Sequence, residues 1–295
     1  MNLIKPEFLK KGDTIGILST SGAVDEKENV LRAKSFFENL GYKVVLSDYL
    51  FDKNRYLAGS DENKIKELHN FFLNPEIKAI LCSRGGYGAI RLIKSIDYKL
   101  IRKNPKIFCG YSDITALSLM MLKNAGLITF SGPMAQSDFG VENPDTYTIE
   151  SFFKAVTSNE LTYNVKYSGE KISGLLWGGN LSTVVSLCGQ DFVPDKDFIF
   201  FTEDLNEPVY KIDKMLTQLF NIDKFKKHIK ALVVGDFLDV DNQKWLDDLF
   251  EEIAKKYNIP VVKGLKVTHS KTKDTFPIGS MAVLSNDKLV CSLNN

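Results

Sequence analysis

The sequence predicts an α/β protein in which helices wrap a parallel sheet and the chain continues into a second domain. Short apolar runs alternate with stretches of helical periodicity over the first half of the chain, a pattern typical of βαβ units. Several apolar runs end in turns rich in glycine and serine, and in a parallel sheet such turns meet at one edge. At 295 residues the chain is long enough for two domains with separate cores.

The first half of the chain supplies the parallel sheet. Apolar runs predict strands over 13–21, 42–46, 77–82 and 107–109. Apolar residues at helical spacing predict helices over 28–40, 60–72 and 89–93, and a further helix from Asp113 onward. Gly41 follows the first helix, at the position where a glycine commonly ends one.

The second half begins after a segment of weak periodicity, which we interpret as a helical segment leading into a linker. We therefore divide the chain into a first domain (1–140), a helical segment and linker (141–167) and a C-terminal domain (168–295). In the last part we expect a glycine-rich opening at 174–180, strands at 198–202, 231–235, 261–262 and 267–269, helices at 181–187, 212–220 and 245–257, and closing β-structure at 277–284.

Composition and charge limit the classes of partner. The chain is 44% hydrophobic and 25% charged, as in ordinary soluble globular proteins. Its net charge of +1 comes from 38 basic and 37 acidic residues, so no nucleic-acid partner is expected. The first residues lack the apolar core of a signal peptide, and no apolar run reaches the roughly 18 residues of a membrane span. We therefore expect a cytoplasmic protein without a membrane partner.

The four cysteines are scattered along the chain without the spacing of a metal site or a redox motif. They are Cys82, Cys109, Cys188 and Cys291. Three of them fall in apolar runs, so buried reduced thiols are expected rather than disulfides or zinc ligands. No metal and no other cofactor is expected.

The segment 106–115, KIFCGYSDIT, holds the first candidate for chemistry. An apolar run ends at Cys109, Gly110 breaks the pattern, and helical periodicity begins at Asp113. Ser112 is therefore expected on a sharp turn between a buried strand and a helix N-terminus, which lifts its side-chain oxygen clear of the backbone. Two interpretations are open, a serine nucleophile or a helix cap formed by Ser112 or Asp113.

Glu203 and His269 are the candidates to activate a serine. His269 ends a predicted strand, whereas His69 lies on a predicted helix and His228 in a lysine-rich segment, where surface positions are expected. Glu203 follows another predicted strand, with a solvated turn as the alternative. A nucleophilic serine needs a base, and that base needs a carboxylate to fix its tautomer. Together with Ser112 these two residues supply the three roles.

A glycine-rich loop, Arg84–Gly88, follows the predicted strand 77–82. Its G-G-x-G spacing differs from the G-x-G-x-x-G of dinucleotide sites. The loop is either a tight turn or a place where a backbone N–H approaches an oxyanion closely. Cys82 and Cys109 flank this loop and the serine turn, so a thiol nucleophile is a further alternative.

Four segments taken together resemble the LD-carboxypeptidase family of serine peptidases, whose relatives include the microcin immunity proteins. They are RGGYG at 84–88, GYSDITAL at 110–117, GGNLS at 178–182 and TEDLNEPVYKIDKML at 202–216. The resemblance extends over nearly the whole chain. It implies a flavodoxin-like first domain, a smaller β-rich C-terminal domain, a homodimer, and a site between the domains that needs no metal.

The resemblance also implies roles for individual residues. The serine of the GYSD motif corresponds to Ser112 as nucleophile, the first acidic residue of the ED motif to Glu203, and the late histidine to His269. The backbone N–H groups of Gly86 and Asp113 correspond to the oxyanion hole.

The activity implied by the resemblance is removal of the terminal D-alanine from murein tetrapeptides, which cuts an L,D bond during cytoplasmic peptidoglycan recycling. Arg84 is a candidate for binding the terminal carboxylate, with bracing of the glycine turn as the alternative. Trp177 is a candidate wall of the cleft, with a place in the core as the alternative. Two other functions stay open, namely cleavage of acyl-sulfamoyl adenylates as in microcin immunity, and non-catalytic binding of a small ligand.

Overall fold

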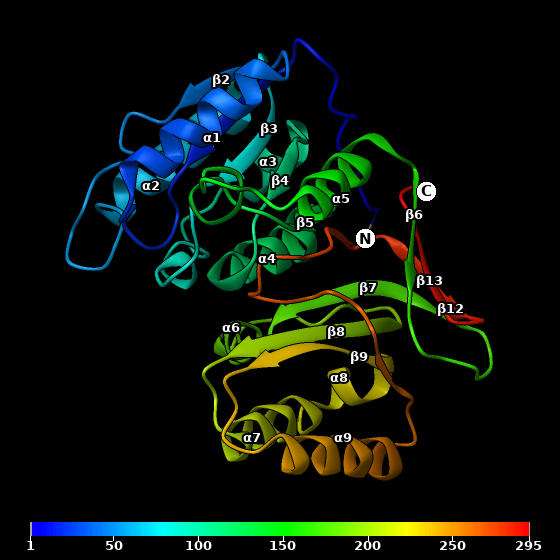
Figure 1. Cartoon of the computed structure of the whole chain (residues 1–295). Helices are drawn as coiled ribbons and strands as arrows, with labels where there is room; N and C mark the ends of the chain where they lie inside the picture. Colours follow the sequence, from blue (N-terminus) through cyan, green and yellow to red (C-terminus); the bar gives the residue numbers. More distant parts are fainter. Residues whose placement is uncertain (1, 295) are drawn as a thin grey trace.

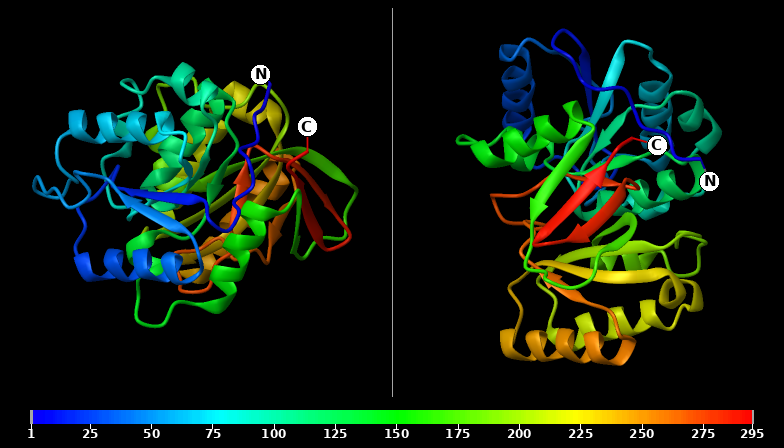
Figure 2. Two further views of the ribbon diagram at one scale, coloured as in Figure 1. Left: turned by 90° about the horizontal axis from the view of Figure 1, so that it is seen from above. Right: turned by 90° about the vertical axis from the view of Figure 1, so that its right-hand side faces the viewer.

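Two β-sheets organise the computed structural model, which describes residues 2–294 (Figure 1). The first sheet has six strands and the second has seven. Figure 2 (right) shows the first domain, coloured blue to cyan, stacked on the second sheet, with the orange helix α9 (Gln243–Tyr257) farthest from it. The predicted α/β fold, with a parallel-sheet first domain and a smaller β-rich C-terminal domain, is confirmed.

The first sheet is flavodoxin-like, because its parallel strands follow the order β2-β1-β3-β4-β5. These strands are β1 (Thr14–Leu18), β2 (Lys43–Leu46), β3 (Ile77–Cys82), β4 (Ile107–Cys109) and β5 (Thr129–Ser131). Every residue of β1 and β4 is buried, as expected for a parallel sheet with helices on both faces. A late strand, β11 (Phe276–Ile278), pairs antiparallel with β5 and extends the sheet.

Helices cover both faces of this sheet. On one face, α1 (Lys27–Asn39), α5 (Thr146–Thr157) and the π-helical turn η3 (Ala135–Phe139) meet in a phenylalanine cluster, where the ring of Phe37 lies 4.7 Å from that of Phe139. Right-handed crossovers place α2 (Asp61–Leu73), α3 (Tyr98–Lys103) and α4 (Thr115–Ala125) on the other face. Within the described part of the chain, no helix is long and apolar enough to cross a membrane.

The second sheet has the order β10-β9-β8-β7-β12-β13-β6. Its parallel strands are β7 (Ile172–Asn180), β8 (Phe198–Leu205), β9 (Ile229–Leu238) and β10 (Val261–Lys263), and its antiparallel strands are β12 (Met281–Ser285), β13 (Lys288–Ser292) and β6 (Glu160–Asn164). The helices of this domain are α6 (Leu181–Ser186), α7 (Val209–Phe220), α8 (Asp223–His228) and α9. An aromatic core joins the sheet to α8, with Trp177 lying 5.0 Å from Phe198 and 6.2 Å from Phe225 between ring centroids.

Three elements differ from the expectation. The glycine-rich opening at 174–180 is part of strand β7, whose glycines allow close approach: a Cβ on Gly178 would lie 1.9 Å from the Phe201 carbonyl oxygen. The predicted strand 267–269 is wrong, because this segment belongs to the loop between β10 and β11. The predicted helix 89–93 is a single 3₁₀ turn, η1 (Ala89–Arg91).

The chain crosses between the sheets more than once. Residues 141–167, expected as a helical segment and linker, contain α5 and also β6, which forms the edge of the second sheet beside β13. In the opposite direction, β11 comes from the C-terminal part of the chain and joins the first sheet. The loop that leads into β11 therefore passes between the two domains.

Candidate active site

The serine turn follows β4 at the carboxyl edge of the first sheet. Ser112 has a φ angle of +61°, which is uncommon for a residue with a side chain and stores local strain. It opens a 3₁₀ turn, η2 (Ser112–Ile114), and α4 begins directly afterwards. The N-cap residues of η2 and α4 are Tyr111 and Ile114, and neither helix receives a side-chain capping bond. The alternative interpretation of Ser112 or Asp113 as a helix cap is therefore wrong.

The glycine-rich loop lies directly against this serine. A Cβ placed on Gly85 would lie 2.8 Å from the Cβ of Ser112 and 2.9 Å from its Oγ, so only glycine allows this approach. Gly86, the next residue, has a φ angle of +102°. The loop after β3 and the turn after β4 thus lie side by side, as predicted for neighbouring parallel strands.

Asp113 ties the two segments together. Its Oδ2 accepts a hydrogen bond of 2.8 Å from the backbone N–H of Ala89, just beyond the glycine loop. Burial raises the pKa of this carboxyl, and hydrogen bonds from Ala89, Ser21 and Gly88 partly oppose the shift. The side chain of Asp113 therefore fixes the loop whose backbone faces Ser112.

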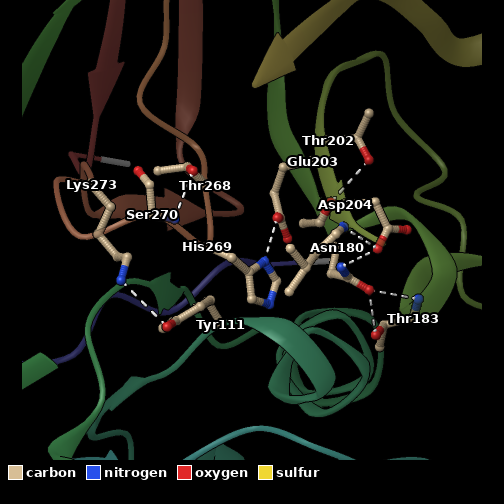
Figure 3. Close-up of polar contacts among 12 residues, drawn as sticks. Tyr111, Asn180, Thr183, Thr202, Glu203, Asp204, Thr268, His269, Ser270 and Lys273 are labelled. Carbon is tan, nitrogen blue, oxygen red and sulfur yellow. Dashed lines mark hydrogen bonds and ion pairs between the residues drawn. The ribbon is translucent and has the colours of Figure 1, made fainter. Parts of the chain in front are cut away.

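Glu203 and His269 are brought together from separate elements of the second domain. Glu203 lies on β8 with 3% of its side chain exposed, and its Oε2 is 2.6 Å from Nδ1 of His269 (Figure 3). With Nδ1 donating its proton to the carboxylate, Nε2 carries the lone pair. The pair thus has the arrangement that a general base needs.

The imidazole of His269 faces the serine turn. Its ring lies 5.1 Å from the ring of Tyr111, the residue before Ser112, in an edge-to-face contact. Both rings line a cavity of about 400 Å³, whose other walls come from residues 137–149 and from the loop 270–273. Residues from two domains therefore meet at the position where the sequence predicts a site.

The loop that carries His269 is held by a buried ion pair. Lys273 contacts Asp138 of η3 and lies 3.3 Å from the Tyr111 hydroxyl. Burial alone would lower the pKa of Lys273, but the charges of Asp138 and Tyr111 and the hydrogen bonds to both residues together raise it. Sequence reasoning missed the role of these three residues, because no local pattern relates Lys273 to a residue so far away in the chain.

A second polar network fixes the ends of β7 and β8 near Glu203. The side chain of Asn180 donates a hydrogen bond of 2.9 Å to Asp204 and caps α6 by accepting from Thr183 (Figure 3). Asp204 also accepts from the backbone of Ser182, and burial raises its pKa. Asp204, the neighbour of Glu203, therefore holds the end of β8 to the start of α6.

Comparison with known proteins assigns this fold to a family. The family model of the LD-carboxypeptidase N-terminal domain matches residues 15–132, and that of the C-terminal domain matches residues 173–284. The chain belongs to the LD-carboxypeptidase family. The resemblance carried by the four motifs is confirmed.

Relatives in this family match nearly the full length of the chain. A probable murein peptide carboxypeptidase of Bacillus subtilis (strain 168) is 37% identical, over 95% of this chain and 91% of the relative. The crystal structure of an MccF-like protein from Bacillus anthracis str. Ames has a TM-score of 0.90 at 30% identity. The match covers 99% of this chain and 100% of the chain in that structure. The crystal structure of a muramoyltetrapeptide carboxypeptidase from Oxalobacter formigenes has a TM-score of 0.87 at 31% identity. The match covers 95% of this chain and 98% of the chain in that structure. The protein is therefore a hydrolase of a carboxypeptidase family.

Two further site residues predicted from the sequence, Trp177 and Arg84, have different surroundings. Trp177 has no exposed surface and belongs to the core, so the prediction that it walls the cleft is wrong. The guanidinium of Arg84 contacts Asp25 and donates to the carbonyl oxygen of Ala23, which agrees with bracing of the glycine turn. Its proximity to Gly86 leaves substrate binding as a prediction.

The remaining histidines and cysteines have other surroundings. His69 accepts a hydrogen bond of 2.9 Å from the backbone of Asp97, and His228 pairs with Asp197 at 3.0 Å. All four cysteines are free, as expected. Burial raises the pKa of Cys82 to about 12 and holds the pKa of Cys109 well above its usual value, which keeps both thiols protonated and disfavours a thiol nucleophile.

Proposed function

We propose that this protein is a serine LD-carboxypeptidase that removes the terminal D-alanine from murein tetrapeptides in peptidoglycan recycling. One observation carries the proposal: the bond between His269 and Glu203 lies in the second domain, and the imidazole packs against the residue that precedes Ser112 in the first. The murein names of two relatives support the substrate class.

In the proposed mechanism, Ser112 attacks the carbonyl carbon of the penultimate residue. His269 removes the serine proton through Nε2 and then delivers it to the amine of the departing D-alanine. Glu203 holds the tautomer of His269 and stabilises the imidazolium that forms. A water molecule, activated by the same imidazole, then hydrolyses the acyl-enzyme and releases the shortened peptide.

The backbone N–H groups of Gly86 and Asp113 are proposed to stabilise the tetrahedral oxyanion. The closeness of Gly85 to Ser112 supports this role, because it brings the glycine loop to the nucleophile without an intervening side chain. Loss of one such donor typically lowers kcat by about 100-fold to 1000-fold. The strained φ angle of Ser112 is in keeping with a nucleophile held in place by its surroundings.

The experiment is turnover of a murein tetrapeptide by the purified protein, with released D-alanine as the readout. We expect Ser112→Ala to lower kcat by about 10⁴-fold or more, whereas the control Ser118→Ala, a buried serine of α4 whose hydroxyl has no hydrogen-bond partner among the described residues, keeps the wild-type rate. Turnover that survives Ser112→Ala would exclude the serine mechanism. A cytoplasmic homodimer, the remaining part of the proposal, is tested by fractionation and by light scattering.

The second candidate function is cleavage of acyl-sulfamoyl adenylates, which is favoured by the structural similarity to a complex of MccF with aspartyl sulfamoyl adenosine (TM-score 0.89, 26% identity). The same chemistry at Ser112 would serve this substrate, so the two activities differ only in what surrounds the site. Parallel assays with the tetrapeptide and an aspartyl-sulfamoyl adenylate distinguish the two functions: the substrate with the higher kcat/KM identifies the main activity. Turnover of neither would favour a non-catalytic binding protein.

A further inference from the structure

A second cavity, of about 520 Å³, is lined in part by Arg84, Gly86 and Tyr87 of the glycine-rich loop. It includes Gly86, whose backbone N–H belongs to the proposed oxyanion hole. Its walls come from the turn after β1, the loop between β2 and α2, and the loop after β3. The charged and aromatic side chains that line it are those of Asp25, Lys53, Arg55, Tyr56, Arg84 and Tyr87. None of these has a part in the mechanism above.

The backbone around this cavity has a fixed position relative to the reacting groups. The β2–α2 loop, at the left of the upper domain in Figure 1, is joined to the turn after β1 by a hydrogen bond of 3.0 Å from Ala23 N–H to the Tyr56 carbonyl. The same turn is joined to the glycine loop by a bond of 3.0 Å from Gly22 N–H to the Gly85 carbonyl. These two bonds join the walls of the cavity to the glycine loop, whose Gly85 lies against Ser112.

Two exposed tyrosines form one wall. Tyr56 is 57% exposed and Tyr87 is 47% exposed, and their rings meet at 5.8 Å with an angle of 61°. Leaving two large rings in water costs free energy that a bound ring would recover. Tyrosine faces and hydroxyls suit a ligand that is flat on one side and polar at its rim, such as a sugar ring.

The charge of the cavity favours an anionic ligand. Lys53, Arg55 and Arg84 are its cationic side chains, and Asp25 is the only acidic one that lines it. Asp25 pairs with Arg84, whereas Lys53 and Arg55 have no ion-pair partner within residues 2–294. Arg55 lies 5.5 Å from the ring centre of Tyr56, which places positive charge beside the aromatic wall. A ligand with both a ring and a carboxylate matches this arrangement.

The size of the cavity decides which end of a peptide it suits. The leaving group of the proposed reaction is a single alanine, whereas a cavity of about 520 Å³ is in the range of sites for much larger ligands. The acyl side of a murein peptide is longer and carries free carboxylates. In its sugar-linked form it also carries an N-acetylmuramic acid ring.

We propose that this cavity binds the acyl side of a sugar-linked murein peptide. The sugar ring packs on Tyr56 and Tyr87, and a peptide carboxylate pairs with Lys53 and Arg55. This inference rests on the proposed function, since it assigns the acyl side of the same substrate. It makes the sugar-linked peptide, rather than the free peptide, the substrate that uses all of the binding surface.

The experiment compares kcat/KM for free tetrapeptide and for N-acetylmuramoyl tetrapeptide. Tyr56→Ala/Tyr87→Ala is expected to lower kcat/KM about tenfold for the sugar-linked peptide and to leave that for the free peptide unchanged. Lys53→Gln/Arg55→Gln is expected to lower both about tenfold, with a smaller loss at high salt. The matched control is Tyr210→Ala, which removes a tyrosine of α7 that is 67% exposed.

The outcomes separate this inference from the function on which it rests. Equal losses for the two peptides in the double tyrosine variant, or no loss for either, would overturn the sugar subsite. If the wild type hydrolyses neither peptide, the proposed function fails. The sugar subsite is then tested separately, by measuring equilibrium binding of N-acetylmuramoyl tetrapeptide to the wild type and to the tyrosine variant. Binding that is about tenfold weaker in the tyrosine variant supports the subsite, whereas equal affinities or no binding to the wild type refute it.

Discussion

Replacing Gly85 with alanine perturbs the contact between the glycine loop and the serine turn. The backbone of Gly85 lies outside the left-handed region, so alanine is not strained there by its own φ angle. The added methyl would lie 2.8 Å from the Cβ and 2.9 Å from the Oγ of Ser112, but 3.6 Å from the backbone nitrogen of Asp113. The clash is therefore confined to the side chain of Ser112.

The size of the effect follows from these distances. Carbon atoms pack at about 3.5–4 Å, so the serine side chain or the loop has to shift by roughly 1 Å. Overpacking of this kind typically lowers the free energy of unfolding by about 1–3 kcal/mol. A misplacement of about 1 Å at a reacting group costs about 100-fold in rate. We therefore expect Gly85→Ala to fold, with kcat about 100-fold below that of the wild type.

The assay is a double-mutant cycle with Ser112→Gly, which removes both atoms that clash and suits the φ angle of +61°. Urea unfolding gives the free energies of the four proteins, and D-alanine release gives kcat for the two that retain Ser112. In the Ser112→Gly background, Gly85→Ala is expected to change stability by no more than about 0.5 kcal/mol.

Two results would refute this reasoning. An equal loss of stability in both backgrounds would mean that the methyl meets something other than Ser112. A Gly85→Ala protein with full activity would mean that the position of the Ser112 hydroxyl does not limit the reaction, and the proposed nucleophile would lose its main geometric support.

Three further predictions concern charged groups around the site. Glu203→Gln is expected to lower kcat by about 10⁴-fold, because an amide no longer stabilises the imidazolium of His269; a rate within tenfold of wild type in steady-state kinetics contradicts that role. Lys273→Met is expected to lower the free energy of unfolding by about 3–5 kcal/mol, because it leaves the buried Asp138 without its ion-pair partner. In urea titrations, Lys273→Met/Asp138→Asn should regain part of this loss. Burial raises the pKa of Asp113 above 3.8, so the folded state binds its proton more tightly than the unfolded state. Its contribution to stability therefore declines as pH rises from 3.8 through the raised pKa, and Asp113→Asn should remove that part of the pH dependence in unfolding experiments between pH 3.5 and 7; an unchanged dependence contradicts the raised pKa.

Local patterns were sufficient for the parallel sheet and for the serine turn. The apolar run that ends at Cys109 and the periodicity that begins at Asp113 define the turn, and both depend on near neighbours. The order of strands then placed the glycine loop beside Ser112, because adjacent parallel strands end at the same edge. The pairing of Glu203 with His269 was predicted from chemistry and from the resemblance.

Other features depend on contacts that no local pattern records. Strand β7 was not predicted, because glycines are uncommon in strands and only the packed fold shows that they allow close approach to Phe201 and Thr115. The position of His269 was assigned to a strand end, whereas the segment is a loop held by a hydrogen bond of 2.9 Å from Asp274 N–H to the Lys266 carbonyl and by the ion pair of Lys273 with Asp138. Such long-range contacts appear only once the domains are packed.

The antiparallel strand β11 has a consequence for the order of events on the ribosome. The nascent chain carries Ser112 and the open edge of β5 long before residues 269–278 are synthesised. Until that late segment emerges, β5 is the unpaired edge of the first sheet and His269, the proposed base, has not been synthesised. The strand that completes the first sheet and the proposed base are therefore delivered by the same late segment, so the first domain is synthesised before the proposed catalytic group can form.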